Sequence, residues 1–406
     1  MTWPGNHPIS EAQRAAWRDE FAESDAALGF EIGDDFVPFT QRDDIFSRAQ
    51  WDPAVRSEDS DAFFASYRAG AVPRRGQGFS QKDFALRNAA WAVSDIISGR
   101  AAHEGAREGF GAPIRPDTAL AKAKAPVDDV AAQTAEIKRL ARLFGADLVG
   151  ITKIDSRWHY SSRVDNRDMS EADNTLPESV THVIVMGHAM DYDLVATYPS
   201  ALAGASTGLE YSHETAICIQ LSGYIRALGY EAVASMNDTA LVIPYAIKAG
   251  LGEYGRNQMV LTPEFGPRVR FSKIFTSLPL VVDQPRKMGL KDYCRTCTKC
   301  AVACPPKALP MGAPQTGRDS RSTIKGVTKW SANCEKCFGY WAKLKTDCAI
   351  CMRVCPFNRR NTGWRDRLWR WLATGRARVV ARAWDQRRGR DKPVKPRDWW
   401  ARQTRG

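Results

Sequence analysis

Nine of the ten cysteines lie between positions 294 and 355, and this group constrains the fold more than any other feature of the sequence. It begins with CRTCTKCAVACP and ends with CAICMRVCP, and CEKC stands between the two runs. The first run has the C-x2-C-x2-C-x3-C-P spacing of bacterial two-cluster ferredoxins, in which three cysteines bind one iron–sulfur cluster and the fourth binds the other. The spacing therefore predicts two 4Fe–4S clusters and a function that includes electron transfer.

Two such clusters need eight thiolates, one fewer than the group offers. The crossover of the fourth cysteine predicts one ligand set, which is Cys294, Cys297, Cys300 and Cys355. The second set has three fixed members, Cys304, Cys348 and Cys351. Its fourth member is Cys334 or Cys337, and the spacing leaves this choice open. Zinc also binds C-x2-C pairs, but a zinc site does not need the C-x3-C-P ending that both halves have here.

The length and composition indicate a globular chain of two or three domains. No apolar run approaches the roughly 18 residues that a membrane span needs. The N-terminal MTWPGNHPISEAQRAAW has no apolar stretch and no twin arginine, so we expect a cytoplasmic protein with no export signal. Cysteines grouped at metal-binding spacing also favour a reducing compartment.

The net charge of +12 belongs to the end of the chain, because residues 357–406 carry 16 Lys and Arg against 4 Asp. Four apolar residues of this tail fit one helical face, Trp364, Leu368, Trp371 and Leu372. We expect the tail to pack on the body with solvated arginines, and an acidic electron donor is the next alternative. Peripheral contact with an anionic membrane is a third. No nucleic acid partner is expected, because nothing else in the chain would read bases.

Strands and helices alternate in the middle of the chain, which predicts an α/β (α+β) core with helices packed on a sheet. Strands are expected at 147–154, 181–189, 231–236 and 269–280. Helices are expected at 130–146, 214–229 and 244–252. The domains follow as an N-terminal helical and irregular region 1–128, the core 129–286, the ferredoxin-like domain 287–358 and the basic tail 359–406.

The order of LEYSHE, SMNDTA, AGLGEYGRN and PEFGPRVRFSKIFTSLPL before the two cysteine runs resembles the corrinoid-dependent reductive dehalogenases. The resemblance extends from about residue 36 to 358 and includes WDP, GFSQKDFALRNAAWAVSD and CEKCFGYW. It implies a nitroreductase-like cobalamin-binding core fused to a two-cluster ferredoxin-like domain, with the cobalamin bound base-off. It also favours Cys337 over Cys334 as the eighth ligand.

Three residues match the catalytic positions of that family, and the resemblance implies their roles. Tyr211 would donate a proton, Asn237 would line the pocket, and Arg270 would lie beside the tyrosine. A phenol has a pKa of ~10 and donates slowly unless its anion is stabilised, which a nearby cation does. The glycine-rich AGLGEYGRN would bring backbone close to the corrinoid or its nucleotide tail, through Gly250, Gly252, Gly255, Arg256 and Asn257.

The predicted function is the replacement of a halogen of an organohalide by hydrogen, with a halogenated phenol as the candidate substrate. A separate ferredoxin or reductase would supply electrons, because the chain shows no fused reductase module. One alternative is an epoxyqueuosine reductase acting on tRNA, which Tyr211 disfavours because that family has an acidic proton donor. Another is a non-catalytic iron–sulfur or corrinoid electron-transfer protein, which needs no proton donor. The sequence predicts no oligomeric state.

Overall fold

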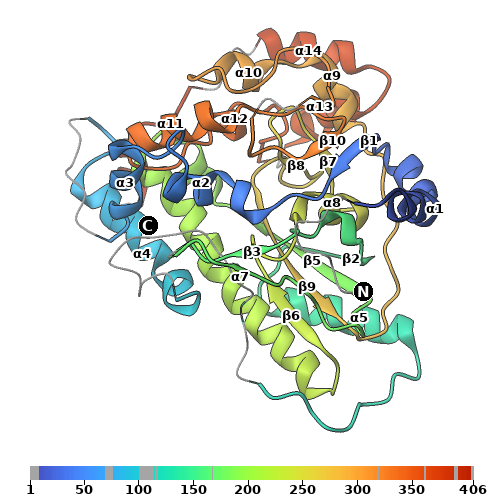
Figure 1. The fold of residues 1–406 in the computed structure, drawn as a ribbon. Helices are drawn as coiled ribbons and strands as arrows, with labels where there is room; N and C mark the ends of the chain where they lie inside the picture. The colour runs from blue at the N-terminus through green and yellow to red at the C-terminus, as the bar shows by residue number, and fades with distance from the viewer. Residues whose placement is uncertain are drawn as a thin grey trace.

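A four-stranded sheet lies at the centre of the computed structural model, with the strand order β2–β5–β9–β6 (Figure 1). Every neighbouring pair is antiparallel, so the predicted α/β (α+β) class is confirmed and the fold belongs on the α+β side. The strands are β2 (Leu148–Lys153), β5 (His182–Ala189), β6 (Ala232–Ser235) and β9 (Val269–Thr276). The structure describes residues 9–68, 76–99, 114, 118–166, 168–317, 320–360, 363–387 and 392–403.

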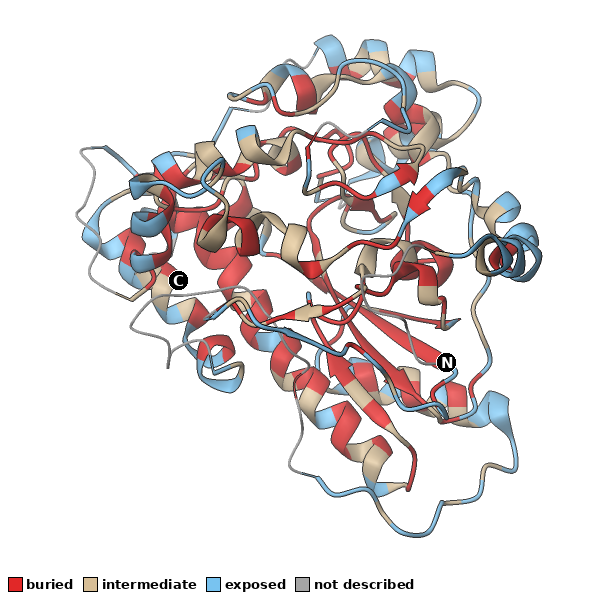
Figure 2. Ribbon diagram, in the orientation of Figure 1, coloured by how far each residue is buried: buried red, intermediate tan, exposed pale blue. Residues whose placement is uncertain are grey.

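Helices cover both faces of this sheet. Strand β5 is buried on both sides, and its residues alternate between two apolar cores. Ile184 and Met186 pack with helix α7 (Ala201–Ala227) on one face. Val183 and Val185 pack on the other face with Tyr245 and Ala246 of helix α8, which spans Val242–Lys248. The sheet is therefore the middle layer of three, as the red ribbon at the centre of Figure 2 indicates.

Helix α7 is longer than the sequence predicts, because it begins at Ala201 and not near residue 214. Ser200 caps it, and its Oγ accepts a hydrogen bond from the amide of Ala203 at 3.0 Å. Most residues of the helix are buried on every side, so the polar–apolar period that marks an amphipathic helix is missing. The correction matters because it places Tyr211 inside a rigid helix.

The N-terminal region is tied to the cysteine-rich region by strand pairing. Strand β1 (Ile32–Val37) pairs antiparallel with β10 (Lys325–Val327). Gly326 permits this approach, because its φ is +73° and a Cβ there would lie 2.4 Å from the Cα of Phe36. The other N-terminal elements are α1 (Glu11–Leu28), η1 (Gln41–Asp43), α2 (Ile45–Trp51), α3 (Glu58–Ala65) and α4 (Gln81–Ile97).

Short helices carry the cysteines, and three further helices form the tail (Figure 1). The cysteine-bearing helices are α9 (Leu290–Thr296), α10 (Lys299–Ala303), α11 (Cys334–Leu344) and α12 (Ile350–Arg353). The tail helices are α13 (Trp364–Thr374), α14 (Arg378–Arg387) and α15 (Pro396–Gln403). The remaining elements are α5 (Val130–Leu143), η3 (Ser156–Trp158), β3 (Arg163–Val164), β4 (Glu171–Ala172), α6 (Tyr192–Val195), β7 (Glu253–Tyr254) and β8 (Val260–Leu261). In the part of the chain that the structure describes, no helix is long and apolar enough to cross a membrane.

A buried ion network fastens α1 and α8 to the segment after β2. The carboxylate of Asp155 is fully buried and accepts hydrogen bonds from Arg157 Nη2 at 2.8 Å and Lys248 Nζ at 2.7 Å. Arg157 Nη1 also donates to Asp25 Oδ2 of α1 at 2.6 Å. Burial by itself would raise the pKa of Asp155, but Arg157 and Lys248 hold it below its ordinary value.

We expect Asp155→Ala to lower the free energy of unfolding by about 3–5 kcal/mol, because it leaves the buried Lys248 without its carboxylate and Arg157 with Asp25 alone. Because the folded-state pKa of Asp155 is lowered, its stabilisation is present above the unfolded pKa of ~3.9 and is lost as the pH falls through the folded value. Urea unfolding measures the change. The matched control is Glu11→Ala, which removes an exposed ion pair with Arg18 and should cost less than about 1 kcal/mol. Equal losses in the two variants would contradict the role of the network.

Candidate active site

The three predicted catalytic residues meet at one point, although they come from distant parts of the chain. Tyr211 lies in the middle of α7, Asn237 follows β6, and Arg270 is on β9. The phenol oxygen of Tyr211 accepts hydrogen bonds from Asn237 Nδ2 at 2.5 Å and from Arg270 Nη2. The guanidinium carbon of Arg270 also lies 4.3 Å from the centre of the tyrosine ring. Two donors, one of them cationic, thus stabilise negative charge on the phenol oxygen.

Asn237 is exposed and lines a large cavity, although the residues on both sides of it are buried. Its carbonyl accepts a hydrogen bond from Tyr160 Oη at 2.9 Å. On either side, the carbonyls of Met236 and Asp238 accept from Lys273 Nζ at 2.6 and 3.0 Å. Burial lowers the pKa of Lys273 to about 8. Tyr160 and Lys273 therefore position the backbone of the loop around Asn237, and the side-chain amide of Asn237 contributes its hydrogen bond to Tyr211.

Trp91 is a further residue of this site, and the sequence reasoning did not single it out. Its ring stacks on Tyr211 with 4.6 Å between the ring centres and 25° between the planes. Gly208, one turn before Tyr211, makes room for the indole, because a Cβ there would lie 2.4 Å from Trp91 Cδ1. The family-like segment DFALRNAAWAVSD contains Trp91, so the signal was present. The stacking fixes the plane of the phenol.

Arg270 lies near the carboxylates of Glu214 and Asp347 as well as beside the phenol of Tyr211. Burial by itself would lower the pKa of Arg270, but Tyr211, Glu214 and Asp347 raise it above the ordinary value. Asp347 is buried, and its Oδ2 accepts hydrogen bonds from Tyr198 Oη at 2.6 Å and Thr207 Oγ1 at 2.7 Å. The guanidinium therefore stays charged in a site that excludes most water.

The three residues and Trp91 line a large cavity of about 550 Å³. This volume is in the range of cofactor and small-molecule sites. Near Tyr211 its wall is mainly aromatic and includes Phe39, Phe63, Phe64, Trp91, Tyr160 and Trp341. A second part of the wall is basic and includes Arg286, Lys287, Lys291 and Lys329. A third part is formed by Cys348, Ala349 and Met352.

The first predicted ligand set surrounds a second, small cavity. Cys294, Cys297, Cys300 and Cys355 line it together with Asn257, Tyr293, Pro356 and Phe357. Burial raises the pKa of Cys294 and of Cys300 to about 12, with smaller effects from neighbouring thiols. Such thiols become ligands only when a cation holds the thiolates, which an iron–sulfur cluster does. The four side chains therefore fit a cluster.

The thiols of the second set also lie close together. Burial raises the pKa of Cys351 most, and nearby thiols raise it further, namely those of Cys348, Cys337, Cys300 and Cys304. Burial and its neighbours raise the pKa of Cys337 to about 12. The sulfur of Cys304 accepts a hydrogen bond from the amide of Ala308 at 3.3 Å, an interaction that tunes iron–sulfur potentials. Within the described residues, no three His, Cys, Asp or Glu side chains converge on a single-ion site.

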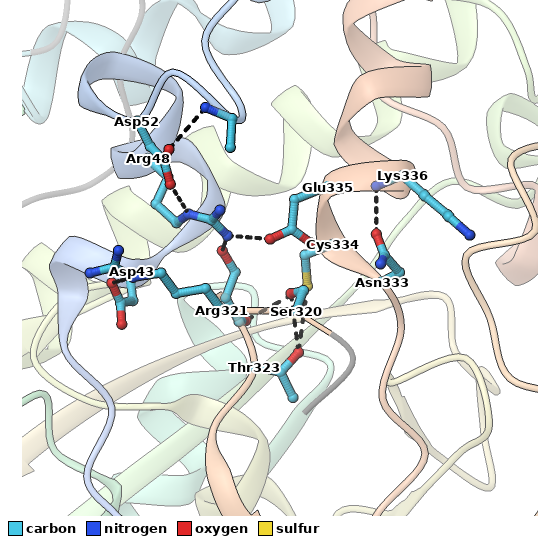
Figure 3. Close-up of polar contacts among 12 residues, drawn as sticks. Asp43, Arg48, Asp52, Ser320, Arg321, Thr323, Asn333, Cys334, Glu335 and Lys336 are labelled. Atoms are coloured by element: carbon cyan, nitrogen blue, oxygen red, sulfur yellow. Dashed lines mark hydrogen bonds and ion pairs between the residues drawn. The ribbon is translucent and has the colours of Figure 1, made fainter. Parts of the chain in front are cut away.

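Cys334 has different surroundings from Cys337, although both lie on α11. Figure 3 shows Cys334 beside Ser320 and Thr323. The thiol of Cys334 donates to the carbonyl oxygen of Ser322 at 3.6 Å and lies 3.9 Å from Thr323 Oγ1. The next residue, Glu335, pairs with the buried Arg48 of α2. Cys334 therefore joins α11 to the loop before β10 at the wall of the large cavity. These contacts suit a thiol, whereas a cluster ligand is a thiolate.

The glycine-rich segment is placed differently from the prediction. None of the five residues proposed to contact the corrinoid is among the described residues that line the large cavity, namely Gly250, Gly252, Gly255, Arg256 and Asn257. A Cβ on Gly250 or Gly252 would instead meet the carbonyl oxygen of Gln284 or Leu261, at 2.6 and 2.4 Å. The segment still forms part of the wall, but through the neighbouring residues Glu253, Tyr254, Gln258 and Met259.

Arg256 binds the cysteine region and not a cofactor in the large cavity. It is buried, and its Nε donates to the carbonyl oxygen of Cys297 at 2.9 Å. Its Nη2 donates to that of Cys294 at 3.0 Å, and its Nη1 to that of Gly312 at 2.6 Å. Asn257 lines the small cavity between the four cysteines of the first set. The sequence alone does not distinguish a glycine-rich turn that packs against other protein segments from one that contacts a ligand.

These features define an iron–sulfur protein with a large cavity beside its second group of cysteines. The family model described as 4Fe–4S double cluster binding domain matches residues 293–358, and the one described as reductive dehalogenase subunit matches 154–280. A tetrachloroethene reductive dehalogenase of Desulfitobacterium hafniense is 30% identical over 379 residues, which cover 76% of this chain and 68% of that protein. The chain belongs to the reductive dehalogenase family, and the predicted resemblance is confirmed.

Other relatives agree with this placement. A tetrachloroethene reductive dehalogenase of Sulfurospirillum multivorans is 35% identical over 250 residues, 55% of this chain and 50% of that protein. The fold matches the catabolic reductive dehalogenase NpRdhA with a TM-score of 0.68 and 22% identity, over 90% of this chain and 48% of that one. The chain thus spans about half the length of these two proteins. An epoxyqueuosine reductase of Bacillus anthracis is 34% identical over 132 residues, 31% of this chain and 32% of that protein.

We expect Cys337→Ala to remove one cluster, because it deletes a ligand of the second set. Reconstituted protein should then hold about four iron atoms per chain in place of the eight of a double-cluster domain, as iron analysis and low-temperature EPR of the reduced protein would measure. Cys334→Ala, on the same helix, is the matched control and should keep both clusters. Loss of iron from the Cys334 variant with retention in the Cys337 variant would reverse the assignment.

Proposed function

We propose that the protein reduces a carbon–halogen bond with a corrinoid bound in the large cavity. The observation that supports this proposal is that one cavity is lined both by Tyr211 and by a cysteine of the second cluster set. Tyr211, with its two hydrogen-bond donors, lies on one part of the wall, and Cys348 of the second cysteine set lies on another. A redox cofactor inside would therefore contact both a source of electrons and a source of protons.

The lining suits a corrinoid in size and in charge. A cavity of about 550 Å³ is large for a solvent-sized substrate alone. The basic residues Arg286, Lys287, Lys291 and Lys329 would hold the phosphate of the nucleotide tail. One solved structure with the same fold, at a TM-score of 0.68, is described as suggesting a mechanism for B12-dependent dehalogenation. Binding in the base-off form stays a prediction.

The reaction consumes two electrons and one proton, so that R–X becomes R–H and X⁻. When bound in the large cavity, cobalamin would supply the low-valent cobalt that reduces the carbon–halogen bond. Tyr211 gives its phenolic proton to the product carbon, and Asn237 and Arg270 hold the phenolate that remains. Trp91 keeps the phenol in one plane against the cavity. The charge of Arg270 also favours an anionic substrate or a departing halide.

Electrons reach the cavity through the two cluster sites. The first cysteine set shares an apolar cluster with α9 and the tail, away from Tyr211. The second set includes Cys348, which lies in the cavity wall. We propose that electrons enter at the first cluster and pass to the second, from a separate ferredoxin or reductase. The grouped thiols need a reducing compartment, which supports a cytoplasmic location.

A halogenated phenol is the substrate that the cavity favours. The aromatic wall near Tyr211 would stack on a substrate ring, and Arg270 would pair with a phenolate oxygen. The curated relatives are named for tetrachloroethene, which has no group for Arg270 to pair with. A turnover panel with both kinds of compound tests this choice. A higher kcat/KM for the halogenated phenol is expected, and a higher value for tetrachloroethene would contradict it.

The two alternative functions have less support. The match to epoxyqueuosine reductase covers 31% of the chain. The resemblance also implies an acidic proton donor for that family, whereas it assigns this role here to the phenol of Tyr211. A non-catalytic electron carrier would not need the converging donors on Tyr211. Steeply salt-dependent binding of tRNA would favour the first alternative.

We expect Tyr211→Phe to lower the rate of halide release at least about a hundredfold, because it removes the proton donor and keeps the ring. The assay is anaerobic turnover of a halogenated phenol by the reconstituted protein with reduced viologen, with halide measured by ion chromatography. Iron content and the cobalamin spectrum of the variant should match those of the wild type.

Tyr160→Phe is the matched control, because Tyr160 is a second phenol in the wall of the same cavity. It loses the hydrogen bond to the carbonyl of Asn237, so its rate should fall at most about tenfold. Tyr211→Phe with the activity of the wild type would remove the proposed proton donor. Absence of halide release from every compound of the panel, with both cofactors bound, would remove the proposed function.

A further inference from the structure

The outer face of tail helix α13 is apolar and exposed. Trp364, Leu368 and Trp371 lie at helical spacing on one side, with exposed fractions of 64%, 39% and 69%. The opposite side is buried through Trp369, which is 1% exposed and packs edge-on against Tyr293. The tail therefore packs on the body as the sequence predicts, but it does so through Trp369 and not through the face of Trp364, Leu368 and Trp371.

Helix α14 lies beside α13 and also exposes large apolar side chains. Its Ala381 is buried against α13, and the indole of Trp369 donates a hydrogen bond to the carbonyl of Ala381 at 2.9 Å. Val379 and Val380 face the solvent with exposed fractions of 76% and 56%. In Figure 2, α14 lies at the edge of the molecule and its outer side is exposed. Five large apolar side chains are therefore exposed on this pair of adjacent helices, and the exposed side of the pair is called the α13–α14 surface.

The charge of this surface is positive. Residues 363–387 contain seven arginines and two aspartates. Both aspartates are used internally, since Asp385 is buried and pairs with Lys299 at 2.5 Å, and Asp366 pairs with Arg359 at 3.4 Å. The exposed arginines of the surface are Arg365, Arg367, Arg376 and Arg387.

We propose that the α13–α14 surface binds the surface of an anionic lipid bilayer. Tryptophan and aliphatic side chains with arginines around them are the composition of interfacial helices, whose apolar residues enter the boundary between headgroups and acyl chains. Arginines beside them would pair with lipid phosphates. An acidic electron carrier would pair with the arginines, but it would leave the exposed Trp364, Trp371 and Val379 without a function.

The surface lies over the first cluster site. Helix α13 packs on α9, which carries Cys294, and Trp369 packs against Tyr293 and Phe357 in the wall of the small cavity. The helix α15 packs elsewhere, through Trp399 and Trp400 against the region of α4 and α7. Membrane binding would therefore place the first cluster, and not the large cavity, toward the bilayer. This inference does not rest on the proposed function.

The test is flotation of the full chain, with both clusters reconstituted, on phosphatidylcholine vesicles with and without phosphatidylglycerol. We expect binding that requires phosphatidylglycerol and weakens with salt. The double variant Trp364→Ser with Trp371→Ser should lower the partition constant at least about tenfold, because it removes two interfacial anchors. Each of Arg365→Gln and Arg367→Gln should lower it about fivefold.

Leu143→Ser is the matched control, because Leu143 of α5 has the same 69% exposed fraction as Trp371 and lies on another face. It should bind vesicles as the wild type does. Iron content shows that each variant is folded. No binding of the wild type to anionic vesicles, or equal binding by the double tryptophan variant, would overturn the proposal. So would reduction by an acidic ferredoxin that is slowed by the tryptophan variant in the absence of any vesicle binding.

Discussion

The buried guanidinium of Arg256 is the contact on which the relation between cavity and clusters depends. It comes from a turn of the core, and every carbonyl that it contacts belongs to the cysteine region, including those of Cys294, Cys297 and Gly312. Its carbon also lies 4.9 Å from the ring centre of Trp330. A planar group with five donors can satisfy several carbonyls of irregular loops at once, which a lysine cannot. The loops that hold the first cluster are thus fixed to the core that holds Tyr211.

The chemistry of the cysteine region could be predicted because the information is local. Ligand spacing within one loop decides which thiols reach one cluster, so Cys294, Cys297 and Cys300 were grouped from the sequence, and Cys355 followed from the crossover. The choice between Cys334 and Cys337 could not be made in this way. Both lie on the first turns of α11, and only the loop at Ser322 and Thr323, which packs against one side of that helix, distinguishes them.

Two other differences between prediction and structure come from what periodicity does not report. Helix α7 is buried on nearly all sides before residue 214, so its first half carried no helical signal. In the tail the apolar period was read correctly as a helix, but the period cannot say whether an apolar face is covered. Trp369 lies outside the predicted face and is the residue that packs. The convergence of Tyr211, Asn237 and Arg270 was predicted through family resemblance, since no spacing rule joins these three residues.

The large cavity exists only where several regions of the chain meet. Phe39 and Phe63 come from the N-terminal region, Tyr211 and Arg270 from the core, and Cys348 from the cysteine region. The β1–β10 pairing joins the first of these regions to the last, and Arg256 joins the core to the cysteines. Sites at such junctions are common because no single layer encloses a large ligand. Tyr211 and the wall that contains Cys348 therefore keep their distance only while all three regions are assembled, so the cavity is a property of one folded unit.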